Sequence, residues 1–112
     1  ILCGDYNICH HEIDIHDPVR NATVSGFLPE ERQWMTDLVE SGWLDAYRFM
    51  HQNEPDLYSW WSYRARAKSK NKGWRIDYQM VSPSLEDKII KAEIEKEVDL
   101  SDHAPVSIEY TF

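Results

Sequence analysis

The feature that most limits the fold of this sequence is one amphipathic helix set among several short segments with strand character. Residues 29–41 begin with a proline and two glutamates, which suit the first turn of a helix, and Gly42 follows the last turn. Apolar and polar residues alternate in 90–94 and in 106–112, as in half-exposed strands. Because helices and strands do not alternate strictly, the pattern disfavours a doubly wound parallel sheet. We expect a mixed α/β (α+β) fold.

Local composition predicts the remaining elements. Strands are expected at residues 1–5, 57–63 and 75–82, a polar loop at 7–26, a basic loop at 65–73, and a short helical or turn segment from Pro83. The first strand is apolar and is expected to be buried. Trp34 and Leu38 stack on one face of the helix, which we expect to belong to the core.

Size and composition indicate one globular domain. The chain has 112 residues, and an apolar fraction of 42% is too high for a disordered protein. It carries no bilayer-length apolar run and no leader, so we expect an intracellular protein, in the cytoplasm of a bacterium or archaeon or in the nucleus of a eukaryote. Cys3 and Cys9 make no disulfide scaffold, which favours the reduced state. Since the sequence starts inside a strand, we expect that an amino-terminal half is missing.

The charge distribution points to a nucleic-acid partner although the total does not. A net charge of −8 argues against binding a polyanion. No Asp or Glu occurs in residues 57–76, however, and half of the 12 Lys and Arg residues lie there: Arg64, Arg66, Lys68, Lys70, Lys72 and Arg75. A local patch of this kind, and not the net charge, meets a phosphate backbone. A solvated basic loop is the alternative.

Three short motifs carry candidate chemistry. Residues 4–7 (GDYN) place Asp5 and Asn7 about 6.6 Å apart on one side of a strand end, where they can share one ligand, although an ordinary turn has the same pattern. In 101–105 (SDHAP), Asp102 can bind a hard cation and His103 a phosphoryl oxygen; a surface turn is the alternative.

The third motif is an aspartate inside an apolar strand. Asp77 lies between Ile76 and Tyr78 and is costly to bury without a partner. His103 is the natural candidate, because a carboxylate that accepts an imidazole N–H fixes the tautomer. Arg75 or a backbone N–H group could take the same place.

Two other patterns receive structural interpretations. Cys9, His10, His11 and His16 lack the two separated ligand pairs of a structural zinc site, so we expect His10 and His11 to be surface or local hydrogen-bonding groups. Trp61 and Tyr63 are expected to pack within the sheet and not to stack on bases.

In this order the motifs resemble the exonuclease III branch of the endonuclease/exonuclease/phosphatase superfamily. Residues 4–7 and 101–105 resemble its general signatures. The branch-specific signatures are 26–32 (GFLPEER), 58–63 (YSWWSY) and 67–78 (AKSKNKGWRIDY). The resemblance implies that residues 1–112 form the carboxy-terminal half of a four-layer α/β/β/α sandwich of the DNase I-like type.

The resemblance also implies an activity: incision of DNA on the 5′ side of abasic sites, together with 3′-phosphodiesterase and 3′→5′ exonuclease activities. The implied cofactor is Mg²⁺ or Mn²⁺, as one or two ions, with a glutamate ligand from the missing half. The implied partners are duplex DNA with abasic sites and that amino-terminal half, in a monomeric protein without membrane contact. A phosphodiester repels hydroxide, and cations and a proton acceptor lower that barrier.

Residue roles follow from the same resemblance. Asp5 would orient or deprotonate water, Asn7 would hold it, and His103, oriented by Asp77, would contact the phosphate. Asp102, with His103, is assigned to the metal site. DNA contacts are assigned to Asn21, Arg64, Lys68, Lys70, Asn71 and Lys72, and the abasic-sugar pocket to Trp60, Trp74 and Ile76.

Two rival functions remain open. A lipid or inositol phosphatase of the superfamily would gather its basic residues around a small pocket and not along a linear loop. A non-catalytic DNA-binding fragment would bind duplex without cleaving it.

Overall fold

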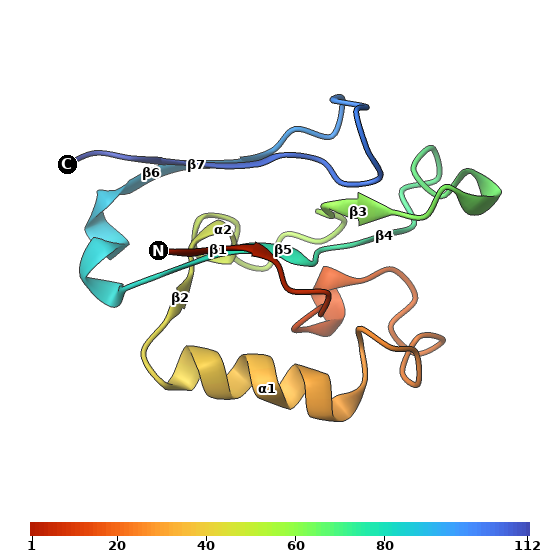
Figure 1. Cartoon of the computed structure of the whole chain (residues 1–112), viewed down its shortest axis with the longest axis horizontal. Helices are drawn as coiled ribbons and strands as arrows, with labels where there is room; N and C mark the ends of the chain where they lie inside the picture. Colours follow the sequence, from red (N-terminus) through yellow and green to blue (C-terminus); the bar gives the residue numbers. More distant parts are fainter.

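A three-stranded antiparallel sheet in the order β1–β5–β2 lies at the middle of the structure, a computed structural model that describes residues 1–112 (Figure 1). Two further antiparallel pairs, β3–β4 and β6–β7, complete the strands. The strands are β1 Leu2–Asp5, β2 Leu44–Asp45, β3 Trp60–Trp61, β4 Gly73–Trp74, β5 Asp77–Val81, β6 Ile89–Ile94 and β7 Val106–Tyr110. The helices are α1 Pro29–Glu40 and α2 Ala46–Met50, with short 3-10 helices η1 Glu12–Asp14, η2 Arg64–Arg66 and η3 Pro83–Lys88. The mixed α/β prediction is confirmed.

Helix α1 lies along one side of this sheet and the β6–β7 pair along the other (Figure 1). The helix starts at Pro29 as predicted, and Glu31 accepts the N–H groups of Gly26 and Leu28. The predicted core stripe is wrong at Trp34, which is 52% exposed. Met35 is the buried residue and packs on Tyr78 and Met80, because the helix turns this face to β5.

Strand β1 is exposed along its whole length, so the prediction that it is buried is wrong. It pairs with β5 on one side only and leaves its outer edge unpaired. Leu2 is 46% exposed. The two alternating segments do pair as β6 and β7, but a register shift between Ile89 and Lys91 turns Ile90 outward to 50% exposure.

Sequence patterns missed the segment after α1. Leu44 and Asp45 form β2, and Asp45 then caps α2 by accepting the N–H of Arg48 at 3.2 Å. The predicted strand at 57–63 shortens to β3, and that at 75–82 to β5. None of the helices has the length and apolar character that a bilayer crossing requires.

The long loop after β1 is held to the sheets at several points. Ile15 forms an isolated antiparallel bridge with Trp74, and the N–H of His16 donates to the carbonyl of Gly73 at 3.0 Å. Gly26 has a φ of +100°, and a Cβ there would lie 2.7 Å from the Trp74 ring. Glycine therefore lets the end of this loop close over Trp74.

Candidate active site

Three segments that are far apart in the sequence meet at one end of the central sheet. Asp5 ends β1 and lies opposite Asp77, the first residue of β5. His103 precedes β7, and its backbone bridges Trp60 of β3. The antiparallel register and this bridge therefore bring the predicted catalytic motifs to one place.

The side chains at this place are in contact. His103 Nδ1 lies 2.9 Å from Asp77 Oδ2, so the predicted pairing of these two residues is confirmed. His103 Nε2 lies 3.6 Å from Asp5 Oδ2 and 4.0 Å from Asp102 Oδ1. One imidazole is thus surrounded by three carboxylates, with its Nε2 edge toward the two that are partly exposed.

This surrounding charge sets the protonation of the pair. Burial lowers the pKa of His103, but its hydrogen bond to Asp77 and the charges of Asp77, Asp5 and Asp102 outweigh it, so the pKa lies above its usual value. Burial raises the pKa of Asp77, although His103 and Ser59 act in the opposite direction. An ion pair alone would lower the pKa of Asp77. Because three carboxylates face the ring, we assign the proton to His103, as an imidazolium beside a carboxylate.

The main chain around the site is fixed by residues that sequence patterns missed. Ser59 is fully buried, and its Oγ accepts the N–H groups of Ile76 and Asp77 at 3.1 and 3.2 Å. The carbonyl of Ser59 also accepts the N–H of Ala104 at 2.8 Å. One serine therefore ties the start of β5 to the segment that carries His103. A lone serine in an aromatic run gives no sequence signal of this role.

Asn7 is joined to the group through its main chain. Its N–H donates to Asp5 Oδ1 at 2.9 Å, and its φ of 57° is left-handed. We expected the side chains of Asp5 and Asn7 to point the same way because residues two apart in a strand do so, but β1 ends at Asp5. Asn7 turns back toward Asp5 and does not continue β1.

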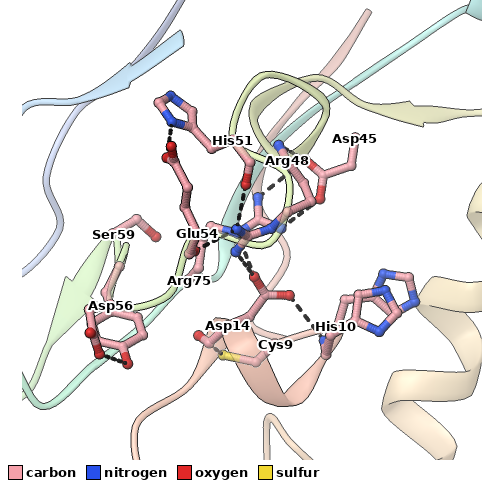
Figure 2. Close-up of polar contacts among 12 residues, drawn as sticks. Cys9, His10, Asp14, Asp45, Arg48, His51, Glu54, Asp56, Ser59 and Arg75 are labelled. Carbon is pink, nitrogen blue, oxygen red and sulfur yellow. Dashed lines mark hydrogen bonds and ion pairs between the residues drawn. The ribbon is translucent and has the colours of Figure 1, made fainter.

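Arg75 does not pair with Asp77, because it belongs to a separate buried network (Figure 2). Arg75 is fully buried and donates to Asp14 Oδ1 at 2.8 Å and to Asp45 Oδ2 at 2.6 Å. Arg48 donates to the same Asp14 oxygen at 2.6 Å. Burial raises the pKa of Asp14, but the two guanidinium groups outweigh it and lower the pKa to about 2. In the sequence, Arg75 is one of the basic residues of 57–76 and an alternative partner for Asp77, and nothing local to it indicates Asp14 or Asp45.

The three residues assigned to a sugar pocket lie together. Trp60 and Trp74 are paired across β3 and β4, with ring centroids 6.1 Å apart and planes at 88°. Both pack on a cluster that contains buried Ile76. Trp60 Nε1 also donates to Asp102 Oδ2 at 2.9 Å, so this wall touches the catalytic group.

The residues assigned to DNA contacts occupy two neighbouring loops. Asn21 Nδ2 donates to the carbonyls of His16 and Asp17 at 2.9 and 3.1 Å and so shapes the loop beside β4. In the basic loop, Lys68 contacts Asp99 at 2.9 Å and lies 5.2 Å from the centre of the Trp61 ring. The others differ in exposure: Arg64, Lys70 and Lys72 are exposed, and Asn71 is partly buried.

The aromatic and histidine interpretations have mixed outcomes. Trp61 is buried as expected, but Tyr63 is 80% exposed, so its predicted packing in the sheet is wrong. The chain bends into η2 directly after Tyr63, which takes its ring off the sheet. His11 is exposed as expected, but His10 is buried and its Nε2 lies 2.9 Å from Thr36 Oγ1 of α1, so the prediction of a surface or local group is wrong for His10. The Cys9 thiol faces the carbonyl of Asp14.

Hollows border the site on two sides. One of about 320 Å³ is lined by Asp5 and Asp77, and another of about 350 Å³ is lined by Asp102, Tyr63 and Lys68. A larger apolar hollow of about 580 Å³, beside Tyr6, Ile8, Glu30, Glu31 and Trp34, lies away from the Asp–His group. The site hollows are favoured for the chemistry because their linings include Asp5, Asp77 and Asp102, the carboxylates that surround His103.

Comparison with known proteins identifies the family. The model of the "Endonuclease/Exonuclease/phosphatase family" matches residues 1–103. The chain belongs to the endonuclease/exonuclease/phosphatase family. Among curated members, an exodeoxyribonuclease of Bacillus subtilis is 46% identical over 108 residues, which are 96% of this chain and 43% of that protein. DNA repair nuclease APEX1 of Danio rerio is 39% identical over 108 residues, again 96% of this chain and 35% of that protein.

Solved structures of family members agree. An AP endonuclease from Archaeoglobus fulgidus superposes with a TM-score of 0.92 at 27% identity, over 98% of this chain and 44% of the other. The 3′ phosphatase NExo from Neisseria, determined bound to a product DNA hairpin, gives a TM-score of 0.90 at 30% identity, over 99% and 44%. The chain thus spans less than half the length of these family members, and its mixed α/β fold matches part of an AP endonuclease fold.

Proposed function

We propose that this chain is the carboxy-terminal part of a single endonuclease/exonuclease/phosphatase domain that incises DNA 5′ to abasic sites. The accompanying activities are 3′-phosphodiesterase and 3′→5′ exonuclease. The observation that carries the proposal is the pairing of His103 with Asp77 at 2.9 Å, with Asp5 and Asp102 on the open side of the ring. Homology to exodeoxyribonucleases and AP endonucleases supports it.

The contacts of Asp5, Asp77 and His103 support their proposed roles, and Asn7 is assigned by its place next to Asp5. Asp5 is 38% exposed at the carboxylate, so it can accept a proton from an attacking water. Asn7, beside it, holds that water and the phosphate. Asp77 orients His103, whose positive charge faces the phosphate and stabilises the charge that develops there.

The donor set fits a hard divalent cation. Carboxylate oxygens of Asp5 and Asp102 lie 3.6 and 4.0 Å from His103 Nε2. One side-chain atom each of Asp5, Asp77 and His103 lies within 4.8 Å of the other two. Mg²⁺ and Mn²⁺ prefer such oxygens and retain water or phosphate ligands. Asp102 is the residue we assign to the metal, and a glutamate of the amino-terminal half would add a further ligand. His103, as an imidazolium, would lie beside the ion without ligating it. The bound ion supplies Lewis acidity toward a phosphoryl oxygen.

The proposed amino-terminal half covers surface that is open in this chain. Strand β1 is exposed on all four residues, and its first residue Leu2 and the preceding Ile1 are 46% and 55% exposed although they are apolar. Exposed apolar area of this kind is a place for a further segment of the same domain. A whole domain would therefore complete both the sheet region and the cation site.

The proposed substrate contacts follow the same surface. We assign the baseless sugar to the rings of Trp60 and Trp74, which lie edge-to-face beside the Asp102 carboxylate and would leave no room for a nucleotide that still carries its base. Lys70 and Lys72 are exposed on the basic loop and attract the DNA backbone.

The test is cleavage of an oligonucleotide duplex with one abasic site by the full-length protein that carries this chain, with and without chelator. Asp5→Asn, which keeps the shape and removes the base, should lower the rate by about 10²-fold or more. Asp37→Asn is the matched control, because Asp37 is exposed on α1 and contacts only Gln33. Near-normal cleavage by Asp5→Asn would contradict the proposed role.

The same assay distinguishes the rival functions. Plain duplex DNA should compete with the substrate, and competition should weaken as salt rises. Hydrolysis of inositol phosphates without such competition would favour a phosphatase. Binding of duplex without metal-dependent cleavage by the full-length protein would favour a non-catalytic domain.

A further inference from the structure

A single hydrogen bond connects the proposed sugar pocket to the proposed metal carboxylate. Trp60 Nε1 donates to Asp102 Oδ2 at 2.9 Å. The other carboxylate oxygen, Asp102 Oδ1, faces His103 Nε2 at 4.0 Å. One oxygen of Asp102 is therefore held by a neutral donor, and the other points toward the centre of the site.

The backbone near Asp102 is fixed, which leaves its side chain as the remaining freedom. Trp61 N–H donates to the Asp102 carbonyl at 3.2 Å, and Trp60 bridges His103. The Asp102 carboxylate is itself 37% exposed and lies near the carboxylates of Asp5 and Asp77 around one histidine. Like charges and solvent would both draw it outward, so a donor on the inner side is needed to hold it toward the site.

The indole that provides this donor is itself immobilised. Trp60 lies edge-to-face with Trp74 and packs on the buried cluster of Cys9, Ile15, Phe27 and Ile76. Its N–H direction is set by this packing and not by Asp102. A phenylalanine at position 60 would fill most of the same space but would have no donor.

We propose that Trp60 is a positioning residue for metal binding, because its indole N–H orients the Asp102 carboxylate. This inference rests on the proposed function. It gives Trp60 a second role, because a residue that only contacted the sugar would not affect the affinity for the cation. Outer partners of metal ligands change metal affinity by about 10- to 100-fold when they are lost. A hydrogen bond to a charged acceptor belongs to the stronger class of such contacts.

The experiment measures metal affinity without substrate. Mn²⁺ binding to the full-length protein is titrated by electron paramagnetic resonance, and Mg²⁺ binding by competition with it. Trp60→Phe should weaken Mn²⁺ binding about 10-fold. Trp34→Phe is the matched control: it makes the same ring exchange on α1, where the side chain is 52% exposed and makes no hydrogen bond to a carboxylate, and its metal affinity should stay within about 2-fold of wild type.

A second measurement keeps the proposal testable if Trp60→Phe folds poorly. In protein labelled with ¹⁵N-tryptophan, the Trp60 indole resonance should move as Mg²⁺ is added, and Asp102→Asn should abolish that response. An indole resonance that ignores Mg²⁺, or equal metal affinity of Trp60→Phe and wild type, would overturn the proposal. If Asp102→Ala itself leaves metal affinity unchanged, the proposed metal role of Asp102 fails instead, so the two failures are distinguishable.

Discussion

Removing the acceptor at the centre of the buried ion network should cost a large part of the stability of this chain. In Asp14→Ala, Arg75 loses its contact at 2.8 Å and Arg48 its contact at 2.6 Å, and the N–H of His11 loses an acceptor at 3.0 Å. Arg75 is fully buried and retains only Asp45 as a charged partner. An uncompensated buried charge cannot be solvated where it stands.

The magnitude follows from these contacts. Hydrogen bonds to charged groups contribute about 1.5–3 kcal/mol each, and breaking a buried pair from one side costs about 3–5 kcal/mol. We therefore expect a loss of about 4 kcal/mol in the free energy of unfolding, which in a domain of this size lowers the melting temperature by roughly 15 °C or more. That loss is a large fraction of the 5–15 kcal/mol typical of a folded domain.

Urea unfolding followed by tryptophan fluorescence measures this loss, with the slope of the transition as a check that the unfolded state is unchanged. Asp37→Ala is the control, because the side chain of this exposed aspartate accepts one hydrogen bond, from Gln33, and its loss should cost less than about 0.5 kcal/mol. A loss below about 1 kcal/mol for Asp14→Ala, at an unchanged slope, would refute the assignment of this network as a main source of stability.

Two further predictions concern protons and DNA. Burial, together with the charge of His11, lowers the pKa of His10 from 6.5 to about 4. Because the unfolded chain takes up this proton at the higher pH, stability should fall by about 3 kcal/mol as the pH drops from 6.5 to 4, and urea unfolding of His10→Gln should show a flatter profile. For DNA, Lys70→Ala or Lys72→Ala in the full-length protein should each reduce the slope of log binding constant against log salt by about one. Lys91→Ala, on β6 and paired with Glu93, should leave that slope unchanged, and equal slopes in all variants would count against the basic loop as the DNA contact.

Elements whose signals are local could be predicted from the sequence. Pro29 and the glutamates after it mark the start of α1, and alternation marks β6 and β7, because neighbours within a few residues decide these backbone conformations. Short elements such as β2 carry too few residues for a pattern and were missed. The motifs around Asp5 and His103 were also visible as sequence, although their contact was only an expectation.

Tertiary structure decided which partner each charged or aromatic residue takes. Nothing local to Asp77 distinguishes His103 from Arg75; the register of β1 on β5 and the bridge from Trp60 to His103 make the choice. Packing likewise buries Met35 in place of Trp34, because a helix face is defined only by the sheet it meets. Local sequence fixes backbone propensity, whereas burial and pairing depend on residues that are distant in the chain. The sequence by itself therefore determined the motifs and the elements with strong local signals, such as α1, β6 and β7, and the fold determined the site.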